Sequence, residues 1–120
     1  MSESPNLDPA ALQRLQRLGD AAFAVKMINL FLEYAPQKIA EARAAQAAGN
    51  WTGVEKAVHP LKSSAGNVGA RRIQELAHHI EELAGQCQIE SLGANLSDLE
   101  QAFAAVKPEL EEKRQGLLPD

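Results

Sequence analysis

The chain has 120 residues, a net charge of −4 at pH 7 and a single cysteine, Cys87. This length suits one domain with its own hydrophobic core and is too short for two, and one cysteine excludes an internal disulfide. Nucleic acid is not an expected partner, because the basic residues are scattered among acidic ones and phosphate-backbone binding needs a clustered basic surface. No apolar run approaches the roughly 20 residues that span a bilayer, and the polar, acidic start is unlike a signal peptide. We therefore expect a soluble, cytoplasmic protein without a membrane partner.

The composition predicts an all-helical domain, because Ala, Leu, Glu and Gln are abundant while β-branched and aromatic residues are few. Asp8 followed by Pro9 is a helix-start signal, and Gly19 ends the short helix that follows. The apolar residues of that helix are Leu12, Leu15 and Leu18.

A second helix is expected to start at Asp20, which can cap it, and to continue to Ala48. Pro36 interrupts its hydrogen-bond pattern. We predict one long helix with a kink near Pro36, although two separate helices are an alternative. Its apolar residues at helical spacing are Phe23, Met27, Leu30, Phe31, Tyr34 and Ile39.

A third helix follows the stop signal Gly49-Asn50 and closes within residues 66–69. Its apolar stripe is Val54, Val58, Leu61, Ala65 and Val68. Pro60 conflicts with this pattern, because proline inside a helix typically costs about 3 kcal/mol and disfavours helical geometry at the preceding residue, His59. We expect the helix to bend at His59, or a new helix to start there.

Two further helices complete an antiparallel four-helix bundle with an additional short N-terminal helix. The fourth spans residues 70–85, with its apolar side at Ile73, Leu76, Ala77, Ile80, Leu83 and Ala84. After a loop at 86–90, the fifth carries Leu92, Leu96, Leu99, Phe103, Val106 and Leu110, with Pro108 as a kink or boundary. We predict a single domain over 1–120 with loose tails at 1–7 and 115–120. The starting Met1 and the tail favour a free-standing protein.

One face of the third helix carries side chains suited to chemistry. Lys62, Ser63 and Gly66 follow His59 at i+3, i+4 and i+7, so an imidazole, a cation and two small residues share that face. Lys62 can offset the charge of a group bound to the ring, and the small residues leave room for a partner. The alternative is a partly exposed histidine that lies near a lysine without a function. The sequence has no phosphate-cradling glycine loop and no other nucleotide motif, so any phosphoryl group must come from elsewhere.

Residues 59–70, HPLKSSAGNVGA, resemble the signature of the histidine phosphotransfer (HPt) domain family, roughly His-x-Leu-Lys-Gly/Ser-Ser-x-x-x-x-Gly-Ala. The similarity extends over most of the chain, from the segment Phe31-Leu32 with Pro36 after it to a fourth helix that closes with residues 80–83. The family fold is a helical bundle. Two departures are Ser63, where many members have glycine, and Pro60, which is unusual and suggests a local kink that changes the presentation of His59.

The resemblance implies a role for each matching residue. His59 is the expected phosphoacceptor, through Nε2, and Lys62 stabilises the phosphoryl group. Ser63 and Gly66 keep the approach open to a partner, and Gly69, grouped with them, permits the tight turn into the next helix.

Glu81 matches the position that in many members binds the other imidazole nitrogen, which fixes the tautomer. Together with His78, a possible supporting residue, it also resembles the phosphotransfer domains of chemotaxis-type histidine kinases. By helical position His78 lies with Glu81 on one flank of the fourth helix. His79 lies with Glu82 on the other flank, which is solvated. Because adjacent histidines point about 100° apart, His78 and His79 are not expected to share a metal, and we predict no metal site.

The function implied is that of a phosphorelay carrier in two-component signalling, not an enzyme in its own right. His59 accepts a phosphoryl group from the phospho-Asp of a response regulator receiver domain and passes it to another receiver. The expected partners are receiver domains and a sensor histidine kinase, docking on apolar residues around the site. No cofactor is expected on this chain, while Mg²⁺ is expected on the receiver. The alternatives are a domain phosphorylated directly by a histidine kinase, and a non-catalytic helical adaptor that binds receivers.

Overall fold

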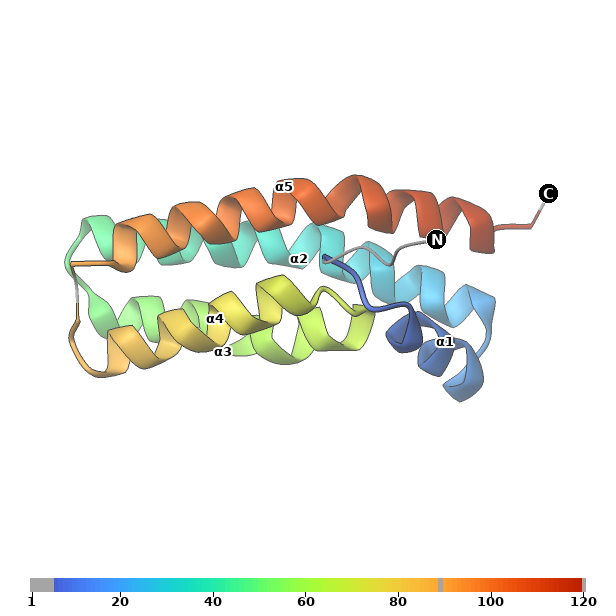
Figure 1. Cartoon of the computed structure of the whole chain (residues 1–120), viewed down its shortest axis with the longest axis horizontal. Coiled ribbons are helices and arrows are strands. Elements are labelled where there is room, and N and C mark those ends of the chain that lie inside the picture. The colour runs from blue at the N-terminus through green and yellow to red at the C-terminus, as the bar shows by residue number, and fades with distance from the viewer. Residues whose placement is uncertain (1–5, 89, 120) are drawn as a thin grey trace.

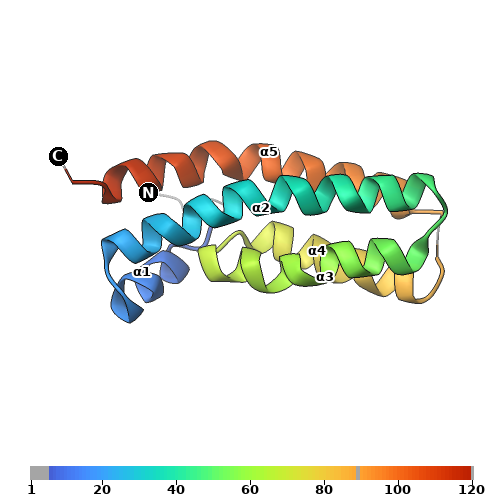
Figure 2. The same cartoon turned by 180° about the vertical axis from the view of Figure 1, so that it is seen from behind.

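The computed structural model describes residues 6–88 and 90–119 and forms an antiparallel bundle. Its helices are α1 (Pro9–Leu18), α2 (Ala21–Ala47), α3 (Trp51–Val68), α4 (Arg71–Gly85) and α5 (Leu92–Leu117). Figure 1 shows α2 and α5 as one layer and α3 and α4 as the other, each helix antiparallel to the next in the chain. The short α1 packs against α2 and α3 at the end of the bundle where α3 stops, as Figure 2 shows from behind. The predicted all-helical four-helix bundle with a leading helix is confirmed.

Side-chain caps start three of the helices. The Asp8 carboxylate accepts a hydrogen bond from the backbone N–H of Ala10 at 3.1 Å, and Asp20 accepts one from Phe23 at 2.8 Å. These contacts confirm both predicted helix starts, since each cap satisfies an N–H group that has no partner within its helix. Asn50 was expected only as a stop signal, but it also begins α3 by accepting a bond from the N–H of Gly53 at 2.9 Å.

Pro36, Pro60 and Pro108 each lie inside a continuous helix. The break or kink expected at His59 is therefore wrong, because α3 is unbroken through residues 56–62, and Pro108 is no boundary of α5. The physical reason is burial on both sides of the proline: Val58 and Leu61, on either side of Pro60, are fully buried. Burying such side chains stabilises each by about 1.5–3 kcal/mol, which together offsets the cost of the proline.

The core side of α2 differs from the apolar set that the sequence suggested. The buried residues of α2 are Ala24, Ile28, Phe31, Ala35, Ile39 and Ala42. The three alanines among them have small side chains, which allow neighbouring helices to approach closely. A second stripe one position away, Phe23, Met27, Leu30 and Tyr34, stays at the surface or only partly buried, with Leu30 49% exposed. Leu18 of α1 is likewise 74% exposed, although its spacing had placed it with Leu12 and Leu15.

The chain ends are less loose than expected. Leu7 is buried, the Asn6 side-chain amide donates to Glu109 at 2.9 Å, and the N–H of Asp8 donates to the carbonyl of Gly69 at 2.8 Å. These contacts hold residues 6–8 against both α5 and the α3–α4 turn. The prediction of loose tails is therefore wrong for residues 6–7 and for 115–117, which continue α5. Residues 1–5 and 120 lie outside the described part of the chain.

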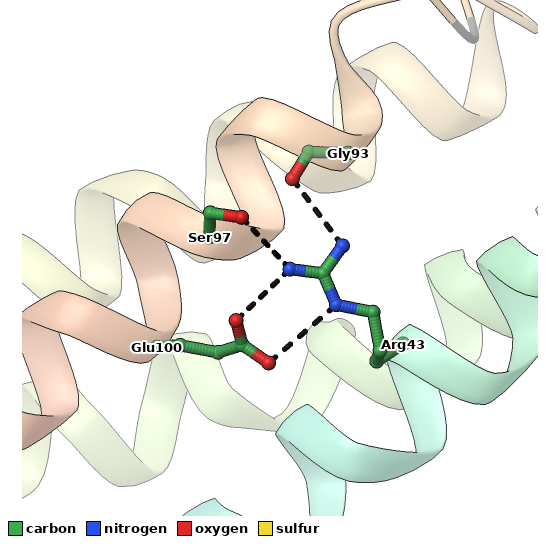
Figure 3. Close-up of polar contacts among 4 residues, drawn as sticks. All are labelled: Arg43, Gly93, Ser97 and Glu100. Atoms are coloured by element: carbon green, nitrogen blue, oxygen red, sulfur yellow. Dashed lines mark hydrogen bonds and ion pairs between the residues drawn. The ribbon is translucent and has the colours of Figure 1, made fainter.

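A guanidinium clamp joins α2 to α5 at the end of the bundle away from α1 (Figure 3). Arg43 donates from Nε and Nη2 to the two carboxylate oxygens of Glu100, at 3.5 and 2.9 Å, and from Nη2 to Ser97 Oγ at 2.9 Å. Its Nη1 donates to the carbonyl of Gly93 at 3.3 Å. One planar fork therefore contacts three residues of α5, a geometry that lysine cannot reproduce.

Candidate functional site

The turn at Gly69 brings α4 back alongside α3. Gly69 adopts a left-handed conformation with φ of 80°, and its N–H donates to the carbonyl of Gly66 while the N–H of Ala70 donates to that of Ala65 at 2.8 Å. This pairing satisfies carbonyls at the end of α3 and reverses the chain within two residues. Residues of α4 therefore lie opposite the middle of α3, where His59 is.

Glu81 of α4 contacts the side chains of both His59 and Lys62. One carboxylate oxygen pairs with Nδ1 of His59 and the other accepts from Nζ of Lys62. Glu81 is 18% exposed, whereas the imidazole of His59 is 67% exposed. The carboxylate thus lies on the protein side of the ring and holds it by the Nδ1 edge. The structure brings together three of the residues that the family resemblance had singled out.

The electrostatics of the site favour an ionised Glu81. Burial by itself raises the pKa of this carboxyl, but the hydrogen bonds and charges of Lys62 and His59 outweigh burial and hold the pKa below its usual value of 4.5. An ionised carboxylate only accepts hydrogen bonds, so Nδ1 of His59 carries the hydrogen that it shares with Glu81. In the neutral imidazole the lone pair is then on Nε2, the nitrogen on the outer edge of an exposed ring.

Two of the three residues expected to keep the approach open lie on the His59 face. Ser63 is exposed one turn beyond His59, and Gly66 is partly exposed one turn further. A Cβ atom at residue 66 would lie 2.6 Å from Nε2 of Gln74, so the glycine also accommodates a side chain of α4. Gly69 is buried, and a side chain there would collide with the backbone of Asp8. Its grouping with the approach residues is therefore wrong, because it lies at the C-terminus of α3 against residue 8, whereas its predicted role in the tight turn into the next helix is confirmed.

His78 is not joined to this group. Its Nε2 lies 3.5 Å from a carboxylate oxygen of Glu82, and no contact with His59 or Glu81 is found among the described residues. Grouping Glu82 with His79 alone was wrong, because a residue at i+4 lies as close to His78 around the helix as one at i+3 does. His79 is exposed, as expected for a surface histidine.

An apolar groove, which the sequence did not reveal, flanks the His59 face on the α2 side. It encloses about 260 Å³. Its lining residues are Met27, Leu30, Phe31, Tyr34, Ser64 and Asn67. Four of these belong to α2, including three from the stripe left out of the core. The signal in the sequence was that second stripe, which helical spacing alone cannot distinguish from a core stripe.

The described residues contain neither a cluster suited to a metal ion nor a helix suited to a membrane. No group of three or more His, Cys, Asp or Glu side chains there could hold a metal ion. No helix in the same part of the chain is both long and apolar enough to cross a bilayer.

Fold and site together define a helical bundle that presents one histidine nitrogen to solvent. The Hpt domain family model matches residues 26–115, most of the chain. The chain belongs to the Hpt domain family and is a phosphorelay carrier of two-component signalling. No curated protein matches the sequence.

Solved structures show the same fold. Histidine-containing phosphotransfer protein B (HptB) from Pseudomonas aeruginosa PAO1 superposes with a TM-score of 0.88 and is 23% identical, over 94% of this chain and 97% of that one. A putative histidine-containing phosphotransfer protein from rice gives a TM-score of 0.81 and 22% identity, over 92% of this chain and 81% of that one.

Proposed function

We propose that Nε2 of His59 accepts a phosphoryl group from the phospho-Asp of a response regulator receiver domain and passes it to the Asp of another receiver. The observation that supports this most directly is the pairing of Nδ1 with Glu81, which leaves Nε2 as the nitrogen with an available lone pair. Such a carboxylate partner orients the ring and raises its basicity.

The transfer step is a displacement at phosphorus. The Nε2 lone pair forms the N–P bond, the bond from phosphorus to the Asp oxygen breaks, and its electron pair leaves with the receiver carboxylate. The ring then carries a positive charge with its hydrogen still on Nδ1, where the Glu81 carboxylate offsets that charge. Lys62 lies one helical turn from His59 and is the cation that this chain can offer to the phosphoryl oxygens.

The receiver supplies the remainder of the chemistry in this proposal. We expect Mg²⁺ on the receiver and no cofactor on this chain, which acts as a carrier without nucleotide chemistry of its own. The partners are receiver domains and a sensor histidine kinase, in the cytoplasm, with neither nucleic acid nor membrane. The exposed ridge of α3 and the groove beside Met27 and Leu30 form the docking surface that we propose.

Direct phosphorylation by a kinase is the alternative that the Glu81–His59 pair supports, although the position of His78 against Glu82 does not add to it. Two incubations separate the cases: a phosphorylated receiver without ATP, and a histidine kinase core with ATP but no receiver. Uptake of acid-labile, base-stable phosphate in the first, and its loss in His59→Gln, support the relay. Uptake in the second alone supports the kinase-linked domain. Receiver binding without any transfer supports an adaptor.

A further inference from the structure

A polar depression borders the His59 face on the side opposite the apolar groove. It encloses about 380 Å³. Its lining residues are Asp8, Ala11, Arg14, Ser63, Gly66, Asn67, Gly69, Arg71 and Gln74. Ser63 and Gly66 belong to the face that starts at His59, and Asn67 lines both hollows. A protein that covers Nε2 of His59 therefore also covers the edge of this depression.

One wall of the depression comes from outside the region that the family model matches. Asp8, Ala11 and Arg14 lie on α1 and its cap, whereas the match starts at residue 26. The leading helix thus adds side chains to a depression that reaches Ser63, one turn from His59, and the family match does not cover these side chains. Side chains there can affect which partner binds more than they affect the transfer step, because they contact neither the imidazole of His59 nor Lys62.

Two arginines and one carboxylate, Asp8, line the depression, so its formal charge is +1. Arg14 is exposed and has no hydrogen bond or ion pair with any residue that the structure describes, and Arg71 lies on the α4 wall. The carboxylate of Asp8 accepts a bond from the N–H of Ala10 and is engaged in capping α1. Gln74, Asn67 and Ser63 add neutral polar groups. A guanidinium without a partner, in a polar hollow, is complementary to a carboxylate.

We propose that Arg14 is a partner-selectivity residue that binds an acidic side chain on the surface of the docked receiver domain. The inference rests on the proposed function, because the receiver must cover His59 for its edge to reach α1. Arg14 takes no part in the transfer step. A charge at the rim of an interface acts mainly on the rate of association and on the choice of partner, and its effect is screened by salt.

The test uses Arg14→Ala and Arg14→Glu, with Arg17→Glu as the matched control, since Arg17 is exposed on the same helix but does not line the depression. Transfer to His59 is measured from each phosphorylated receiver domain of the source genome, and the fastest donor is then titrated. The receiver concentration for half-maximal rate should rise about threefold for Arg14→Ala and about tenfold for Arg14→Glu at low salt. The rate at saturation should stay within about twofold, and the differences should shrink at high salt.

A charge exchange completes the test. Asp and Glu residues around the receiver phosphorylation site are changed to Lys one at a time, and one of them should restore rapid transfer to Arg14→Glu. The same receiver variant should not speed transfer to Arg17→Glu, which keeps Arg14. Arg14 variants that transfer like wild type would overturn the proposal while leaving the phosphorelay intact. So would variants whose loss of rate is as large at high salt and at saturating receiver as it is at low salt and low receiver concentration. If wild type takes phosphate from no receiver, the proposed function fails and this inference with it.

Discussion

The carboxylate of Glu81 on α4 binds Nδ1 of His59 on α3, across a separation of 22 positions in the sequence. Its other oxygen binds Lys62, one turn further along α3. A single carboxylate therefore fixes both the tautomer of the imidazole and the resting position of the nearest cation.

Removal of the carboxylate should slow transfer. In Glu81→Ala the imidazole loses the acceptor at Nδ1, so its orientation and tautomer are no longer held, and we expect the rate of phosphoryl transfer to His59 to fall about 10- to 100-fold, as for carboxylate partners of metal-binding histidines. Glu82→Ala, which removes the neighbouring carboxylate that pairs with His78, is the control. Equal rates for the two variants, measured with the same phosphorylated receiver, would contradict the role of Glu81.

Removal of the cation beside His59 should also slow transfer. Lys62→Met keeps an apolar stem but cannot donate to phosphoryl oxygens, and the loss of one charge-assisted hydrogen bond corresponds to about a tenfold or greater fall in rate. Lys62→Arg should retain most of the activity. Lys56→Met, an exposed lysine one turn before His59, is the matched control and should transfer like wild type. A normal rate in Lys62→Met would exclude a role for this lysine in the transition state.

The pH dependence of stability should depend on Glu81. Because its pKa is lowered in the folded protein, folding favours the ionised form, and this contribution is present above the unfolded pKa and lost as pH falls through the folded value. The ordinary pKa of this carboxyl is 4.5. As the pH drops below that value, urea unfolding should therefore show that wild type loses stability faster than Glu81→Gln. Parallel curves for the two proteins through this range would contradict the sign of the shift.

The clamp at Arg43 should stabilise the fold without contributing to transfer. Arg43→Lys retains the charge but loses the fork that contacts Gly93, Ser97 and Glu100, and because the ion pair is partly exposed we expect a loss of about 1 kcal/mol. The midpoint of urea unfolding should fall while the slope and the transfer rate stay unchanged. A changed transfer rate at full folding would show that this end of the bundle communicates with His59.

Features encoded by local chemistry could be predicted from the sequence. Asp8 and Asp20 cap helices as expected, because a cap depends on residues two or three positions away. The shared face of His59 and Lys62 follows from helical spacing alone. The contact of Glu81 with His59 was expected only from the family resemblance, and its contact with Lys62 was not expected at all. Both depend on how α4 packs on α3 after the turn at Gly69.

Features that depend on tertiary packing could not be predicted. Pro60 suggested a break, but the burial of Val58 and Leu61 outweighs its local cost. The two apolar stripes of α2 differ by one position, and only the packing of its neighbours places Ile28 in the core and leaves Leu30 beside the apolar groove. The wall that Arg14 contributes likewise depends on where α1 lies, which no pattern within α1 specifies.

The nitrogen of His59 that carries the phosphoryl group shows whether Glu81 selects the reactive atom of the ring. After transfer from a phosphorylated receiver, NMR of the ¹⁵N-labelled protein should place the N–P bond on Nε2 of His59 and the hydrogen on Nδ1, where Glu81 holds it. A phosphoryl group on Nδ1, on another residue, or retained in His59→Gln would contradict the account.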